Sequence, residues 1–251
     1  MLLKLLKYDF RAMWKSFSLI WGAALALAVV NRFTITGRWS TSLVGENTSY
    51  AALFALFLVF AAMFVIASIF VIQRFSRGLL GDEGYLMHTL PVQPWQLVVS
   101  KLICALAVWI ASGVVAVLSM LVMAPVNFLE MLQYPIWQAL FRGIMSHPDV
   151  LAYLAEICLV IVSLMVLGFS TLYLAMSLGH LSPRWKGLAS VAAFIVLDIA
   201  VNLYGGEVSD RFSFCLERHT GLWMAILAVS LPAALCLAGT CWILTHKLNL
   251  E

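Results

Sequence analysis

The feature that most constrains this chain is a stretch without a single charged residue, which runs from residue 50 to residue 72. A helix of about 20 apolar residues is long enough to cross the hydrocarbon core of a bilayer. Five further stretches have similar character, although 17–36 and 187–203 are weaker: the full set is 17–36, 50–72, 102–123, 157–179, 187–203 and 221–244. The sequence therefore predicts an all-α polytopic membrane protein with six transmembrane helices and a single transmembrane domain over residues 1–251.

Composition supports the same class, because 63% of the residues are hydrophobic and only 11% are charged. A typical soluble domain is about 45–50% apolar and about 25% charged. A water-soluble fold of this size cannot bury so much apolar surface, since a large part of its surface stays wet. This excludes a soluble globular enzyme, a nucleic-acid binder and a disordered tail protein.

The basic residues indicate the orientation of the predicted spans, because Lys and Arg accumulate on the cytoplasmic side of membrane proteins. With an even number of spans, ten of the 15 bases share the side of the N-terminus and five lie opposite. Both termini are therefore expected in the cytoplasm. The ten bases are Lys4, Lys7, Arg11, Lys15, Arg74, Arg77, Lys101, Arg184, Lys186 and Lys247.

The first 15 residues predict an amphipathic helix rather than a signal peptide, because charges recur through them and no short apolar region with a cleavage site follows. The spacing of the bases places them on one stripe of a helix, and these residues are Lys4, Lys7, Arg11 and Lys15. Such a helix is expected to lie in the headgroup plane. Its role is either an anchor that sets the topology or an elbow that gates lateral access, and the anchor is favoured because basic amphipathic helices bind anionic lipid.

The connection after the second span, residues 73–101, is the longest expected on the cytoplasmic side. Asp82 and Glu83 form an acidic pair between Gly81 and Gly84, which give the backbone freedom on either side. Three apolar residues with no obvious place in solvent follow, and they are Tyr85, Leu86 and Met87. The pattern predicts a short exposed helix with an acidic and apolar surface, which is typical of a partner-binding site. The alternative is a purely structural connector.

This segment resembles the first cytoplasmic loop of ABC-2-type transporter permeases, most closely small permeases of Gram-positive bacteria. The matching residues are Gly-Asp-Glu-Gly-Tyr-Leu at 81–86, Thr-Leu-Pro at 89–91, Leu97, and Ser-Lys-Leu at 100–102. The opening Leu-Leu-Lys-Leu-Leu-Lys-Tyr-Asp-Phe-Arg, the six predicted spans and the chain length fit the same family. The resemblance covers about thirty residues as a motif and the whole chain only as architecture.

The resemblance implies a role for this loop as a coupling helix that docks in a groove of a separate ATP-binding cassette ATPase subunit. The coupling residues it implies are Asp82, Glu83, Tyr85, Leu86 and Met87. It further implies an exporter in the bacterial cell membrane, built with a second permease chain that is either identical or related. No Gly-x-x-x-x-Gly-Lys-Ser/Thr phosphate loop occurs in the sequence, so ATP and magnesium are expected on the partner subunit.

Two acidic residues, Glu156 and Asp198, lie near or inside predicted spans, where charges are costly and often functional. Glu156 is close to a span end and is expected to reach water. Asp198 pairs with Arg211 or Arg218, contacts substrate, or is protonated within the helix bundle. A proton-coupled secondary transporter that uses both acids is therefore an alternative function, although it leaves the acidic loop without a role.

Catalytic and metal-binding chemistry is not indicated. The five histidines are scattered, and the sequence has neither a His-Glu-x-x-His motif nor a Cys-x-x-Cys pair. No serine or cysteine is flanked by a plausible base. We therefore expect the chain itself to catalyse nothing and to hold no metal.

Overall fold

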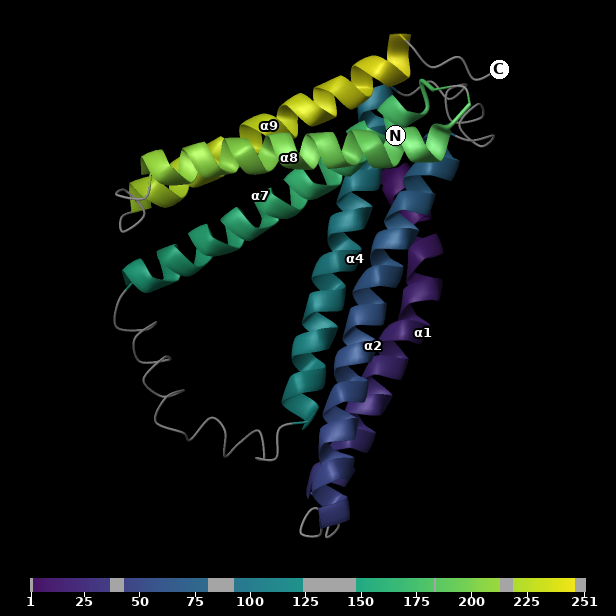
Figure 1. Ribbon diagram of the computed structural model, residues 1–251, viewed down its shortest axis with the longest axis vertical. Coiled ribbons are helices and arrows are strands. Elements are labelled where there is room, and N and C mark those ends of the chain that lie inside the picture. Colours follow the sequence, from purple (N-terminus) through teal and green to yellow (C-terminus); the bar gives the residue numbers. More distant parts are fainter. Residues whose placement is uncertain are drawn as a thin grey trace. The chain divides into compact units, whose positions relative to one another are not determined.

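The computed structural model describes residues 2–36, 43–80, 93–123, 148–182, 184–212 and 219–246, and these are almost entirely helical (Figure 1). The helices, labelled as in Figure 1, are α1 (Leu2–Thr36), α2 (Leu43–Phe75), the short π-helix η2 (Ser76–Leu80), α4 (Pro94–Met123), α7 (Pro148–Gly179), α8 (Lys186–Phe212) and α9 (His219–His246). This agrees with the all-α class predicted from the sequence.

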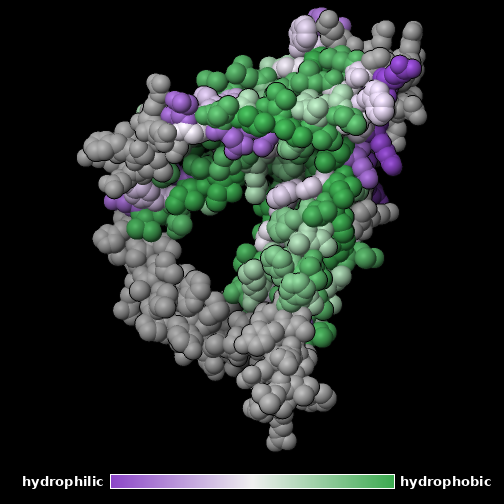
Figure 2. Space-filling model, in the orientation of Figure 1, coloured by the Kyte–Doolittle hydropathy of each residue, from purple (hydrophilic) through white to green (hydrophobic). Residues whose placement is uncertain are grey.

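Five of the described helices are long and apolar enough to cross a membrane. These segments are Phe54–Leu79, Pro94–Val122, Asp149–Gly179, Lys186–Val208 and His219–His246. Large apolar side chains are exposed along them, and Figure 2 shows such side chains over most of the visible surface of the described helices. So much exposed apolar surface is expected when lipid, rather than water, surrounds the helices. The structure thus supports a polytopic membrane protein.

The remaining predicted span, 17–36, lies in α1, where the apolar stretch is the shorter segment Phe17–Phe33. The structure contains one continuous helix of 35 residues from Leu2 to Thr36, where the sequence predicts an interfacial segment followed by a span. There is no break between the two segments near Ser16. That the segment in α1 crosses the membrane stays a prediction.

The chain forms two compact units, and the first consists of Lys7–Phe70 and Ala107–His147. Aromatic contacts join its helices: Phe17 meets Phe70 edge-on with ring centroids 5.2 Å apart, and Phe64 lies 5.2 Å from Trp109. Polar contacts add to them, since Trp21 Nε1 donates a hydrogen bond to Ser112 Oγ at 3.1 Å. These contacts pack α1, α2 and α4 together within this unit.

Arg32 caps the C-terminal end of α4 in the same unit. Its guanidinium donates a hydrogen bond of 3.0 Å to the carbonyl oxygen of Val122, in the last turn of α4. The final carbonyls of a helix have no partner within the helix and carry partial negative charge, so a cation there is favourable. A base at the end of the weakest apolar segment is thus used to cap a neighbouring helix.

The second unit consists of Met1–Leu6, Val71–Leu106 and Pro148–Glu251. Within it α7 packs against both α8 and α9, and the three helices run side by side in Figure 1. Phe75, the last residue of α2, is fully buried and stacks on Tyr173 of α7 with ring centroids 4.1 Å apart and planes 7° apart. This stack holds the end of α2 against the last two turns of α7.

Candidate functional site

The predicted coupling residues fall in the segment 81–92. Asp82, Glu83, Tyr85, Leu86 and Met87 therefore lie outside the described residues. The structure does describe the helices on either side of this segment, η2 before it and α4 after it. Pro94 is the first residue of α4, as its position in the sequence predicts, because a helix start tolerates the missing N–H of proline.

Both ends of the segment are held by buried residues. Before it, Phe75 and Leu79 are fully buried, and after it Leu97 and Val98 are almost completely buried. Ser100 is also buried and donates a hydrogen bond of 2.8 Å to the carbonyl oxygen of Leu97. A force applied to residues 81–92 therefore acts on helix ends that are packed into the protein rather than on loose chain.

The predicted anchor residues lie on α1. The side chains of Lys7 and Arg11 are exposed and stand one helical turn apart, as the predicted stripe requires. Those of Lys4 and Lys15 are outside the described side chains. The exposed Tyr8 and Trp14 lie on the same helix, which gives this part of α1 both basic and aromatic surface.

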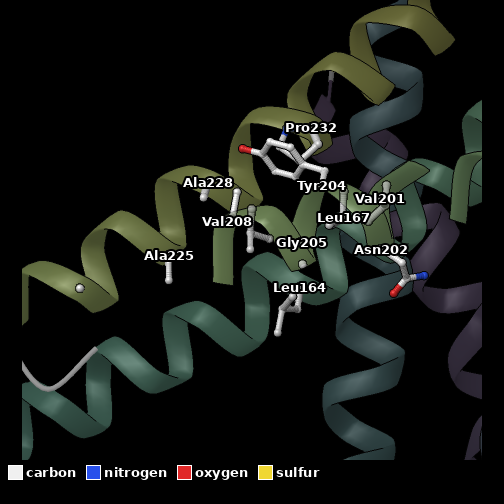
Figure 3. Close-up of a pocket in the computed structure, with 13 residues that line it drawn as sticks. Leu164, Leu167, Val201, Asn202, Tyr204, Gly205, Val208, Ala225, Ala228 and Pro232 are labelled. Atoms are coloured by element: carbon white, nitrogen blue, oxygen red, sulfur yellow. The ribbon is translucent and has the colours of Figure 1, made fainter. Parts of the chain in front are cut away.

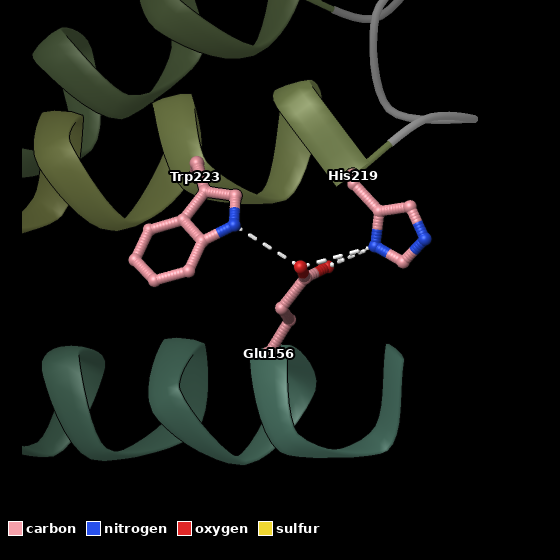
Figure 4. A network of polar contacts seen from close by, with 3 residues as sticks. All are labelled: Glu156, His219 and Trp223. Carbon is pink, nitrogen blue, oxygen red and sulfur yellow. Dashed lines mark hydrogen bonds and ion pairs between the residues drawn. The ribbon is translucent and has the colours of Figure 1, made fainter. Parts of the chain in front are cut away.

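From the sequence, Glu156 of α7 is expected to reach water, but in the structure this residue is buried and only 7% exposed. Both carboxylate oxygens lie 3.0 Å from Nδ1 of His219, and Trp223 Nε1 donates a hydrogen bond of 3.1 Å to Oε1. Figure 4 shows the carboxylate pointing from α7 toward these two side chains of α9. The ring of Tyr153, one turn before Glu156, stacks on His219 with centroids 3.9 Å apart. The cluster joins the start of α7 to the start of α9.

The partners of Glu156 were not identified from the sequence, although their spacing carries a signal. Tyr153 and Glu156 are three residues apart, and His219 and Trp223 are four apart, so each pair shares one helix face. Two such faces, each with polar and aromatic groups at a span end, are complementary. The spacing within each helix does not indicate that these two faces meet.

We expect Glu156→Gln to destabilise the protein by about 1–2 kcal/mol, because a hydrogen bond to a charged group contributes about 1.5–3 kcal/mol and His219 is partly open to solvent. The measurement is thermal unfolding of the purified protein in detergent. The control is Asp149→Asn in the first turn of the same helix, where the carboxylate is exposed and little change is expected. Equal effects of the two variants would contradict a stabilising cluster.

Asp198 lies in α8 and is exposed. Asn202 Nδ2 donates hydrogen bonds to the Asp198 carboxylate at 3.1 Å and to the Asp198 carbonyl oxygen at 2.8 Å, so this contact stays within one helix. The side chains of Arg211 and Arg218, the expected partners, lie outside the described ones. Asp198 contacts Asn202, whereas Glu156 contacts His219 and Trp223, so these two acids lie in separate clusters.

A pocket of about 510 Å³ lies between α7, α8 and α9 (Figure 3). Leu164 and Leu167 line it from α7, and Ala225, Ala228 and Pro232 line it from α9. α8 contributes Val201 together with Asn202 and Tyr204, whose side chains are polar. A pocket of this kind suits an apolar molecule, because the polar groups are few and no acid–base pair lines it.

Among the residues that the structure describes, no group of three or more His, Cys, Asp or Glu side chains is placed to hold a metal ion. Comparison with protein family models, with curated proteins and with solved structures finds no match to this chain.

Proposed function

We propose that this chain is the membrane-spanning permease subunit of an ABC-2-type exporter, with six spans and with both termini in the cytoplasm of a bacterial cell. The observation that carries the proposal is the loop 73–101, which from Gly81 onward resembles the coupling loop of that family. The five long apolar helices are compatible with a permease. ATP and magnesium bind to a separate ATP-binding cassette subunit, since this chain has no phosphate loop.

The buried ends of the segment support a coupling role. Two ATPase subunits that close around nucleotide push on the acidic and apolar loop residues. Because Phe75 is stacked on Tyr173 and the start of α4 is buried, the push is passed to packed helices instead of being absorbed by flexible chain. A second permease chain, identical or related, completes the pathway.

The test is isolation of the tagged chain from its own membranes together with the ATP-binding subunit encoded beside it. The proposal expects a stable complex that hydrolyses ATP, with the Walker-type sequence found only in the partner. When the complex is reconstituted into vesicles, transport should depend on ATP and not on a pH gradient.

The same vesicles test the alternative, a proton-coupled secondary transporter that uses Asp198 and Glu156. That alternative expects proton uptake by the chain alone, without nucleotide, followed by a pH-sensitive dye inside the vesicles. Such uptake, combined with the absence of any ATPase partner, would overturn the proposed function.

A further inference from the structure

A second pocket, with a volume of about 530 Å³, lies where α2, α7 and α8 meet within one compact unit. Ile72 and Ser76 line it at the end of α2 and the start of η2. The end of α7 contributes Met176 and His180, and the start of α8 contributes Lys186 and Phe194. The volume is within the range of about 300–1,000 Å³ that is typical of small-molecule sites.

The pocket has one basic end and an apolar body. Lys186 is exposed at its mouth and His180 is partly buried beside it. The rest of the lining is apolar apart from Ser76 and Ser190; Met176 is buried, and Val191 is exposed. Burial, and secondarily the positive charge of Lys186, lower the pKa of His180, so Lys186 supplies the permanent charge at neutral pH.

The mouth of this pocket lies at the level of the lipid headgroups. His180 directly follows the apolar segment Asp149–Gly179, and Lys186 begins the next apolar segment, Lys186–Val208. Between them Trp185 is 66% exposed, and exposed tryptophan is typical of the membrane interface. The basic end therefore faces the headgroups, while Leu172, Val191 and Phe194 face the depth of the acyl chains.

The helices that line most of this pocket approach each other closely. Gly179 and Ser190 approach so closely that a Cβ at position 179 would lie 2.5 Å from the backbone nitrogen of Ser190. This contact holds the end of α7 against the first turns of α8. A preformed site avoids the cost of ordering its walls when it binds.

We propose that this pocket binds one anionic glycerophospholipid of the surrounding leaflet, with its phosphate at Lys186 and an acyl chain along Val191 and Phe194. The argument is charge complementarity: a neutral lipid gains nothing from the basic end, and a soluble anion gains nothing from the apolar body. Basic pockets between transmembrane helices are known to bind acidic lipid headgroups. This inference needs only the membrane helices and does not depend on the proposed transport function.

The first test compares two basic residues two positions apart. Protein in detergent receives equal amounts of phosphatidylglycerol and phosphatidylcholine, and native mass spectrometry counts the retained lipids. Wild type should retain phosphatidylglycerol preferentially, and Lys186→Gln should lower the ratio about fivefold, since a basic residue near an acidic headgroup contributes that order of affinity. Arg184→Gln removes the same charge from an exposed residue that does not line the pocket, and should change the ratio less than about twofold.

The second test fills the pocket. A Cβ at Gly187, which lines the pocket, meets no atom within 4 Å, so the side chain of Gly187→Phe starts from open space at the pocket wall. It should remove bound phosphatidylglycerol. Gly168→Phe is the matched control, because position 168 of α7 is equally open but does not line the pocket. An unchanged elution profile in size exclusion confirms that each variant is folded.

Three results would overturn the proposal. They are equal retention of the two lipids by wild type, equal effects of Lys186→Gln and Arg184→Gln, and full displacement of the lipid by glycerol phosphate in large molar excess. The last result would identify a site for a free anion. Occupation by a second copy of the chain would appear instead as a dimer that Gly187→Phe dissociates, with no selectivity for acidic lipid.

Discussion

Replacing Gly179 by alanine is expected to destabilise the protein by about 2 kcal/mol, the usual cost of inserting atoms into a well-packed contact. A Cβ at this position would lie 2.5 Å from the backbone nitrogen of Ser190 and 2.6 Å from its Cα, and closer still to its Oγ. Because two of these three atoms belong to the backbone of α8, a side-chain rotation cannot relieve the overlap. The corner between α7 and α8 must open, and thermal unfolding in detergent should begin about 5 °C lower.

Two controls separate this contact from general effects of losing a glycine. Gly168→Ala lies in the same helix with no atom within 4 Å of the added Cβ, and it should be neutral or slightly stabilising, since alanine favours helix more than glycine does. In the Gly179→Ala background, Ser190→Ala should not restore stability, because the backbone atoms remain. Full rescue by Ser190→Ala would show that only the hydroxyl is in the way.

The reason for glycine at this position could not be read from the sequence. Gly179 ends α7, where glycine is common because it adopts a positive φ. Yet none of the glycines that the structure describes has a positive φ, and at position 179 the need comes from the approach of another helix. Ser190 follows eleven residues later, and a single sequence does not indicate which atoms of two neighbouring helices come closest.

Five of the apolar spans were predictable from the sequence, but the starts of two of them were not. The predicted ends at residues 123 and 179 coincide with the last residues of α4 and α7. At the other end both helices begin eight or nine residues earlier than the predicted spans, at Pro94 and Pro148. The predicted spans begin directly after a charged residue, Lys101 or Glu156, whereas in the structure each helix continues through that residue, which is buried.

In the candidate site, the sequence likewise indicated the two acids but not the distant partner of Glu156. Asp198 and Glu156 could be selected from the sequence because a charge in an apolar stretch is unusual. Their partners differ in how local they are. Asn202 is four residues from Asp198, a spacing that the sequence displays, whereas His219 is 63 residues from Glu156 and meets it only because α9 packs on α7.

Reversing the charge of both acids in the loop, with Asp82→Lys and Glu83→Lys, is expected to reduce recovery of the ATPase subunit with this chain by roughly tenfold or more, because unfavourable charges at an interface cost several kcal/mol. ATP hydrolysis by the complex and ATP-dependent transport should fall in parallel. Membrane insertion should be unchanged, since neither residue lies in one of the apolar stretches predicted from the sequence. The measurement is the ratio of ATPase to permease after affinity purification, with the total amount of chain in the membrane as reference.

The control for this variant is the pair Asp149→Lys and Glu207→Lys, two exposed acids outside the loop, each near one end of an apolar segment. Each double variant shifts the net charge by the same amount from its starting value of +3, so a general effect of charge on solubility or insertion appears in both. The neutral pair Asp82→Asn and Glu83→Gln should lie between wild type and the reversal if charge is what the partner recognises. If all three variants recover the ATPase equally, the acidic pair has no part in binding, and the coupling role must rest on Tyr85, Leu86 and Met87 or be abandoned.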